Sequence, residues 1–332
     1  MQAYFSRQIL LNEIGHIGQD KIANANVLII GLGGLGAHIA QLLIRAGLVK
    51  LALIDYDVVT ATNLNRQLLY SKSDLGKYKV QVAKEHLGNI YEDENQIEAL
   101  VQKITKYNVR DIIAPYDYIV DATDNYETRY LINDACVSEN KPWISSSIQA
   151  WNAQIAFYNL LESKGNTHTY RCVFPEQPEL QFHENCDTVG ALGASCSIVS
   201  SIVANELLLE ITNKTNLRVQ FLNLDLLNLS IHKFLVKRVL PQNLETYVIE
   251  VGNLWSLNHN ERELGISSAE LNEYILFDLD DLAIDVTYYL EEFTPMDNEI
   301  YVFTCAGGKR SRIIAKRIKT KFPVATIFYL QG

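Results

Sequence analysis

The feature that most constrains the fold of this chain is the glycine-rich hexapeptide Gly31–Gly36, which lies between two apolar segments. The short run Val27–Ile30 predicts a strand, and the apolar residues of Ala37–Ala46 recur at helical spacing. At such a strand-to-helix turn the first N–H groups of the helix have no intrahelical partner, and glycine lets an anion approach them. We therefore predict that the turn binds phosphate through Gly31, Gly33, Gly34 and Gly36.

Two later strands are followed by carboxylates. Leu51–Ile54 ends at Asp55, which follows the glycine turn at close to the ~20-residue offset expected of a ribose-binding acid. Tyr118–Asp121 leads into Thr123, Asp124 and Asn125, so Asp124 lies at the carboxyl end of a strand and suits Mg²⁺. Simpler roles remain open, because aspartates also cap turns, and Asp124 could be the N-cap of a helix beginning near Tyr126.

The segment between these strands is polar and cationic. A lone glycine turn with a following acid is also typical of nicotinamide-dependent oxidoreductases. Such enzymes do not need the cations Arg66 and Lys79, whereas a triphosphate about to be cleaved needs positive charge at its leaving group. Taken singly, each could be an ordinary surface cation. Together they favour a nucleoside triphosphate.

The order of the predicted elements indicates an α/β protein. Strands and helices alternate to about residue 150, which predicts a Rossmann-like, mostly parallel sheet with helices on both faces. A helix over Gly190–Ile211 should precede two antiparallel strands, Val219–Leu224 and Leu229–Val236, that close this first domain. Two other strands are expected at Pro142–Ile148 and Gln154–Tyr158.

A polar segment from Ser163 to Asp187 is long for a connection without structure, so we predict a crossover above the active site. Near its end lies Cys186, just before the predicted helix, where the helix dipole would favour a nucleophilic thiolate. Cys136 and Cys196 lie within helical patterns and are expected to be small buried residues.

The C-terminal part has a different pattern. The strand Ile300–Thr304 ends at Cys305, and Cys305–Ser311 is similar to the active loop of rhodaneses, C-x-x-G-x-R-S, before a predicted helix over Arg312–Lys321. N–H groups of such a loop stabilise a thiolate or persulfide. We expect domains at 1–240 and 265–332, with a linker at 241–264 and a reduced rhodanese-like second domain that is either active or an inert relic.

Composition sets outer limits. The net charge of −10 argues against a broad basic nucleic-acid-binding face. Neither a signal peptide nor an uninterrupted membrane span is recognised, so we expect a cytoplasmic protein without a membrane partner. Five cysteines without a secretory signal do not suggest a disulfide framework.

Over about residues 4 to 236 the chain resembles the ThiF/MoeB/HesA family of ubiquitin-activating-enzyme-like adenylyltransferases. The motifs that carry the resemblance occur in the family's order: Ser6–Ile9, Gly18-Gln19, Gly31–Gly36, Asp55–Asp57, Asn63–Gln67, Lys79-Val80 and Thr123–Asn125.

The resemblance implies ATP-dependent adenylation of the C-terminal glycine of a small ubiquitin-like sulfur-carrier protein with a Gly-Gly tail, for thiamine or molybdopterin synthesis. It assigns Asp55 to the ribose, Asp124 to magnesium, and Arg7 to the triphosphate of the neighbouring subunit of a homodimer. A persulfide on Cys305, supplied by a donor such as a cysteine desulfurase, or a thiol at Cys186 would then introduce sulfur. Phosphate contacts are implied for Asn63, Arg66 and Lys79, and further nucleotide contacts are expected from Asp57, Gln67, Thr123 and Asn125.

Many relatives hold structural zinc through two Cys-x-x-Cys pairs, but this chain has Thr169 at the first position and no second pair. We predict no structural zinc, and expect His168, Cys172 and His183 to be ordinary rather than ligands. Two functions from other classes remain: a nicotinamide-dependent oxidoreductase, and a non-catalytic scaffold for a ubiquitin-like partner.

Overall fold

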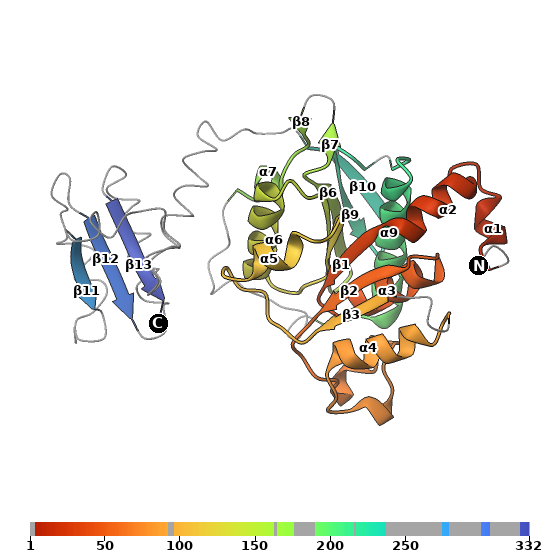
Figure 1. Ribbon diagram of the computed structural model, residues 1–332, viewed down its shortest axis with the longest axis horizontal. Coiled ribbons are helices and arrows are strands. Elements are labelled where there is room, and N and C mark those ends of the chain that lie inside the picture. Colours follow the sequence, from red (N-terminus) through yellow and green to blue (C-terminus); the bar gives the residue numbers. More distant parts are fainter. Residues whose placement is uncertain are drawn as a thin grey trace. The chain divides into compact units, whose positions relative to one another are not determined.

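The computed structural model describes residues 4–91, 96–162, 165–175, 190–215 and 217–236, and the backbone of three later strands. Two compact units are present, Met1–Val239 and Leu240–Gly332. The first unit has a central sheet between helices (Figure 1).

The helices of the first unit that pack on its sheet or extend from it are α1 (Ser6–Ile9), α2 (Gly15–Asn24), α3 (Gly36–Arg45), α4 (Lys79–Gly88), α5 (Val109–Ile113), α6 (Tyr126–Ser138), α7 (Tyr170–Val173) and α9 (Gly193–Ile211). Two 3-10 turns, η1 (Ala61–Asn63) and η2 (Lys72–Asp74), lie between β2 and α4. The strands of the large sheet are β1 (Asn26–Ile30), β2 (Lys50–Ile54), β3 (Gln96–Leu100), β4 (Tyr118–Asp121), β5 (Trp143–Gln149), β6 (Asn152–Tyr158), β9 (Gln220–Asp225) and β10 (Ser230–Leu235).

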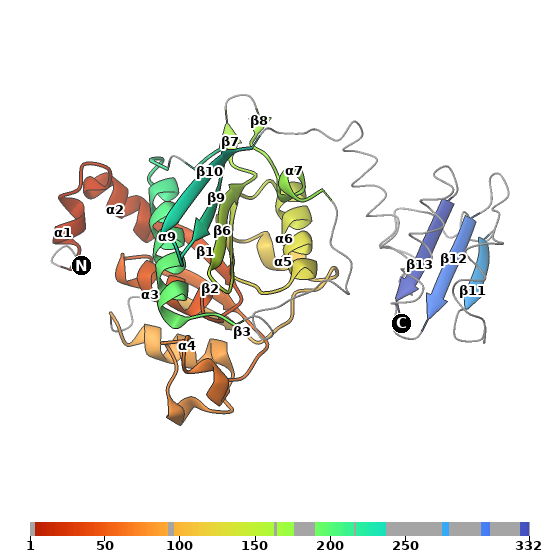
Figure 2. The same ribbon diagram turned by 180° about the vertical axis from the view of Figure 1, so that it is seen from behind.

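The sheet order is β10-β9-β6-β5-β4-β1-β2-β3. Strands β3, β2, β1, β4 and β5 are parallel, whereas β6, β9 and β10 are antiparallel to their neighbours and complete one side of the sheet (Figure 2). Helices α5 and α6 cover one face, and α3 and α9 pack together on the other (Figure 1). The predicted α/β fold is confirmed.

Helix α9 is the one described helix whose length and apolar composition would allow it to cross a membrane. The packing of α9 in the structure offers another explanation for its apolar composition. Val199, Val203 and Leu207 are fully buried in the core of the sheet, and the helix contacts α3, β5 and β6. Burial against a sheet accounts for an apolar helix as well as lipid does.

The predicted crossover contains more regular structure than expected. The hairpin β7 (Leu161–Glu162) and β8 (Gly165–Asn166) and the short helix α7 lie in or beside its first part. Thr169 is the N-cap of α7, and its N–H contacts the Cys172 sulfur at 3.4 Å, so a local capping arrangement ends the loop there. Residues 176–189, with Cys186 and His183, lie outside the described part of the chain.

In the second unit, β11 (Tyr274–Asp278), β12 (Ile300–Cys305) and β13 (Thr326–Gln331) form a parallel sheet in that order. The predicted strand at Ile300–Thr304 corresponds to β12. The loop after Cys305 and the expected helix at Arg312–Lys321 are outside the described residues, so the rhodanese-like assignment stays a prediction.

His168 is buried, although we expected an ordinary surface histidine. It is 1% exposed, packs against the Tyr158 ring at 5.2 Å, and neither ring nitrogen has a hydrogen-bond partner among the described residues. Burial lowers the pKa of His168 from 6.5 to about 4. The folded protein therefore keeps this imidazole neutral where an unfolded chain would protonate it.

That difference predicts acid sensitivity. The contribution of His168 to stability is complete above about pH 6.5 and is lost as the pH falls to about 4, since the unfolded state binds the proton first. The expected loss is about 3 kcal/mol of unfolding free energy. Urea unfolding from pH 7.5 to 4 should show a shallower pH dependence for His168→Leu than for wild type. A control at exposed His232 should follow wild type, and equal slopes for all three proteins would contradict the assignment.

Candidate active site

The glycine turn joins β1 to α3 under tight steric limits. Gly31 has φ +90°, and a Cβ there would lie 2.8 Å from the carbonyl oxygen of Ala122. A Cβ on Gly36 would lie 1.9 Å from the Gly31 oxygen. Glycine is therefore required at both positions because backbone occupies the space that a side chain would need. The backbone of the turn therefore packs directly against Ala122, the residue that follows β4.

Asp55 joins the turn to the end of β2. Its Oδ2 accepts a hydrogen bond from the N–H of Leu32 at 2.7 Å, and its Oδ1 accepts one from the N–H of Asp57 at 2.8 Å. Burial raises the pKa of Asp55, while Lys79 and the two N–H donors partly offset that rise. The carboxylate is thus held beside the turn, where the sequence places a ribose-binding acid.

Lys79 is the first residue of α4 and is 5% exposed. Its Nζ lies 2.8 Å from Oδ2 of Asp57, and its backbone N–H donates to the Asp57 carbonyl at 3.0 Å. The ammonium is therefore brought beside the carboxylates that follow β2. Lys79 is not an ordinary surface cation, since its side chain is enclosed and paired.

The loop through η1 brings Arg66 to the turn. The aliphatic part of Arg66 packs next to Gly34, where a Cβ would lie 3.6 Å from its Cγ, and its Nη1 donates to the Thr62 carbonyl at 2.9 Å. Asn63 has a structural role, because its Oδ1 accepts the Thr60 N–H at 3.0 Å in a capping box. Gln67 lies beneath the turn and is 3% exposed, and its Oε1 has no hydrogen-bond partner in the part of the chain that the structure describes.

A buried ion pair supports the loop after β4. Nε of Arg129 lies 2.7 Å from Oδ2 of Asp121, and both side chains are almost fully enclosed. Asp121 also accepts the N–H and hydroxyl of Thr123, at 3.0 and 2.6 Å, and Arg129 donates to the Thr123 carbonyl at 2.9 Å. Burial by itself would lower the pKa of Arg129, but Asp121 outweighs it and raises that pKa. Asp121 and Arg129 together fix the backbone that leads to Asp124.

Asp124 itself is exposed, and its carboxylate accepts no hydrogen bond from the described residues. The helix cap is Asn125 instead, whose Oδ1 accepts the Thr128 N–H at 2.8 Å. The pKa of Tyr56 is raised, first by burial and then by the charges of Asp57, Asp124 and Asp55, so these carboxylates share one neighbourhood.

Carboxylate oxygens are the ligands Mg²⁺ prefers, and Asp124 presents a free one next to the phosphate turn. Asp124 would therefore be the residue that holds Mg²⁺ here, and the ion would supply positive charge beside the phosphates. Within the described residues no group of three His, Cys, Asp or Glu side chains is arranged to hold a metal alone.

Arg7 is not brought into this group, and two further predicted residues lie outside the described side chains. Arg7 lies exposed on α1, whose neighbour Gln8 donates to the Ala46 carbonyl at 2.7 Å. Ala46 is at the opposite end of α3 from the glycine turn, about 15 Å along the helix, so α1 lies away from the glycine turn of its own chain. Cys186 and the side chain of Cys305 lie outside the described part of the chain.

Several residues at the site were not predicted. They are the ion pair of Asp121 and Arg129, and three side chains that contact carbonyls of the glycine turn, namely His38, Tyr70 and Ser200. The pattern that could have revealed the ion pair is an aspartate at the end of an apolar strand, followed by an arginine on the buried side of the next helix. Cys136 and Cys196 are buried as expected. Cys196 packs under the turn, where its sulfur would lie 3.1 Å from a Cβ on Gly34.

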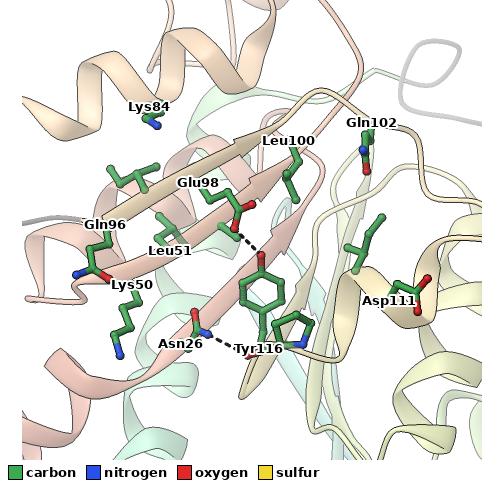
Figure 3. A pocket seen from close by; sticks show the side chains of 14 residues that line it. Asn26, Lys50, Leu51, Lys84, Gln96, Glu98, Leu100, Gln102, Asp111 and Tyr116 are labelled. Carbon is green, nitrogen blue, oxygen red and sulfur yellow. Dashed lines mark hydrogen bonds between the residues drawn. The ribbon is translucent and has the colours of Figure 1, made fainter.

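A separate hollow of about 620 Å³ lies near the amino ends of β1, β2 and β3 (Figure 3). Asn26, Lys50 and Gln96 line it, and Tyr116 donates to Glu98 at 2.9 Å on its wall. None of the residues of the glycine turn or the carboxylates beside it contributes to this hollow.

Comparison with known proteins identifies the family. The model of the ThiF family matches residues 5–243, more than half of the chain. The chain belongs to the ThiF family. The protein named adenylyltransferase and sulfurtransferase MOCS3 of Anopheles gambiae is 41% identical over 204 residues, and that of Sus scrofa is 39% identical over 206 residues.

The aligned parts cover 61% of this chain but only 45% and 44% of those two relatives, so the chain spans less than half of their length. Among solved structures, Escherichia coli MccB with ATP superposes with a TM-score of 0.60 at 22% identity, over 70% of this chain and 73% of MccB. MccB with MccA-N7isoASN gives 0.62, also at 22% identity, over 72% and 73%. These structures show that the ThiF-family unit has the same fold as MccB.

Proposed function

We propose that this protein uses ATP to adenylate the C-terminal carboxylate of a small ubiquitin-like sulfur-carrier protein ending in Gly-Gly. The observation that carries the proposal is the gathering of the glycine turn, the cations Arg66 and Lys79, and the carboxylates of Asp55 and Asp124 at one edge of the sheet. The names of the MOCS3 relatives support this reaction class, and the MccB fold has been solved with ATP.

The site suits attack at the α-phosphorus. A carboxylate oxygen of the carrier forms the new bond to that phosphorus, and the bond from it to the bridging oxygen of the β-phosphate breaks. Pyrophosphate takes the electron pair, so the protein need not transfer a proton. Arg66 and Lys79 would offset the charge that develops on the leaving group, which is the main demand of phosphoryl-type transfer.

Each remaining part of the site has a role in this scheme. Asp55 would accept the ribose hydroxyls, and the N–H groups of the turn would bind phosphate oxygens. Asp124 would hold Mg²⁺, which supplies charge neutralisation at the phosphates when bound. Asp121 and Arg129 are positioning residues for Asp124, because they hold the Thr123 peptide that precedes it.

The sulfur step is a second part of the proposal. A persulfide on Cys305, loaded by a donor such as a cysteine desulfurase, would attack the acyl carbon of the adenylate and release AMP. A second thiol, for which Cys186 is the candidate, would then cleave the acyl disulfide to a thiocarboxylate and form a disulfide. The proposal also includes a homodimer in which Arg7 serves the neighbouring subunit's site. The carrier would be one that takes part in thiamine or molybdopterin synthesis.

ATP–pyrophosphate exchange with a panel of Gly-Gly carriers tests the first step. We expect exchange with one carrier and none with the same carrier lacking its last glycine. Lys79→Met should reduce the exchange rate about 10²–10³-fold, because a buried cation at the leaving group is removed. Lys77→Met is the matched control, since Lys77 is exposed and pairs with Asp74. Equal losses in both variants, or exchange that ignores the carrier, would contradict the proposal.

A further inference from the structure

The backbone of the glycine turn is asymmetric in its hydrogen bonding. Within the described part of the chain, no acceptor is present for four successive N–H groups. They belong to Gly33, Gly34, Leu35 and Gly36. By contrast, each carbonyl of the same peptide units accepts a hydrogen bond. The carbonyl side of the turn is therefore fully hydrogen-bonded, whereas the N–H side has no acceptor among the described residues.

Three of these carbonyls accept from side chains that lie outside the turn. The hydroxyl of Tyr70 donates to Leu32 at 3.0 Å, from the loop before η2. Nδ1 of His38, on the first turn of α3, lies 2.5 Å from the carbonyl of Gly34. The hydroxyl of Ser200, on α9, donates to Leu35 at 3.1 Å, and the same carbonyl also accepts the N–H groups of His38 and Ile39 at 3.1 and 3.0 Å. The fourth carbonyl, of Gly33, accepts from the Ala37 N–H within the helix start at 3.2 Å.

The protonation of these donors follows from their partners. A carbonyl oxygen only accepts, so Nδ1 of His38 must carry a proton. Nε2 of His38 lies 3.3 Å from the hydroxyl of Ser197 on α9, which holds the ring in place. Burial raises the pKa of Tyr70 above its usual value, so its hydroxyl stays a donor.

Because the peptide bond is planar, a hydrogen bond that fixes the direction of a carbonyl also fixes the direction of the N–H in the same peptide unit. In a trans peptide the C=O and the following N–H point in opposite directions. Holding the Leu32 carbonyl toward the protein therefore turns the Gly33 N–H away from it. The Gly34 and Leu35 carbonyls act in the same way on the N–H groups of Leu35 and Gly36.

We infer that three side chains are positioning residues for phosphate binding: Tyr70, His38 and Ser200. They do not touch the nucleotide. They hold the carbonyls on the protein side, so that the N–H groups are aimed at the phosphates before ATP arrives, and no reorganisation is needed on binding. This inference rests on the proposed function only in that the turn's ligand is the triphosphate of ATP.

The test compares ligands with and without phosphates. ATP, inorganic pyrophosphate and adenosine are titrated calorimetrically into the full chain. His38→Ala, Ser200→Ala and Tyr70→Phe should each weaken ATP and pyrophosphate about tenfold, as expected for one lost hydrogen bond, and leave adenosine unchanged. His38→Asn places an amide donor at the position of Nδ1 and should bind ATP within about twofold of wild type.

Matched controls separate positioning from general weakening of the fold. Ser138→Ala removes a serine hydroxyl that donates to the Ala135 carbonyl at 3.0 Å, and Tyr116→Phe removes the hydroxyl that contacts Glu98. Both should bind all three ligands like wild type. If His38→Ala fails to fold, Tyr70→Phe with Tyr116→Phe carries the comparison.

The outcomes separate this inference from the proposed function. Equal losses for ATP and adenosine, or no loss for either, overturn the positioning role. Selective loss of phosphate binding, combined with no adenylation of any carrier, supports the positioning role and rejects the proposed substrate. A wild-type protein that binds neither ATP nor pyrophosphate overturns both.

Discussion

Gly36→Ala is expected to abolish adenylation and to lower the free energy of unfolding by about 3 kcal/mol. The new Cβ would lie 1.9 Å from the Gly31 oxygen and 3.2 Å from the Ala122 Cβ, so β1, α3 or the end of β4 must move. Because these are the elements that carry the phosphate turn, the shift displaces its N–H groups. Urea unfolding measures the loss of stability, ATP titration measures the loss of nucleotide binding, and ATP–pyrophosphate exchange measures the loss of adenylation.

The control for this substitution is Gly88→Ala. Gly88 is the last residue of α4, and a Cβ there meets nothing within 4 Å. Alanine should therefore leave ATP binding unchanged and raise helix stability by up to about 1 kcal/mol. If Gly36→Ala bound ATP as well as Gly88→Ala does, the steric account of the turn would be wrong.

Arg129→Ala is expected to cost about 3–5 kcal/mol of unfolding free energy, because it leaves the Asp121 carboxylate buried without its partner. It also frees the Thr123 carbonyl, so the loop before Asp124 loses its support and adenylation should fall with stability. Unfolding in urea gives the first quantity, and exchange at a temperature where the variant is folded gives the second.

Arg171→Ala is the matched control for this pair. Arg171 makes a bidentate contact with Asp134 at 2.6 and 2.8 Å, but both side chains are partly exposed. Its removal should cost no more than about 1 kcal/mol. Asp121→Asn combined with Arg129→Ala should be less unstable than the sum of the two single variants, since neither charge remains alone. Strict additivity would show that the two residues act independently.

The periodicity of the sequence was sufficient to predict the framework of the first unit. The α/β alternation, the glycine turn and the antiparallel closure all agree with the sheet, because each strand and helix here follows its own hydrophobic pattern. Helix α9 begins at Gly193 rather than Gly190, because the residues before it pair with Ala150 at the end of β5.

The support of the site could not be predicted in the same way. Asp121 and Arg129 come from different elements, and their pairing depends on tertiary packing. The hydrophobic periodicity of the sequence predicts single strands and helices but not which of their side chains meet. Asn63 and Asn125 act as caps for their own turns, a role that their motif positions do not reveal. His168 was misjudged because a polar residue in a polar segment can still be covered by aromatic rings.

The most direct test of the account is the intact mass of a Gly-Gly carrier after incubation with the protein, ATP and Mg²⁺. We predict a carrier heavier by one AMP, with pyrophosphate released in equal amount, and no such adduct with Asp124→Ala or Gly36→Ala. Formation of ADP in place of pyrophosphate, or ATP binding without an adduct on any carrier tested, would contradict attack of a carrier carboxylate on the α-phosphorus.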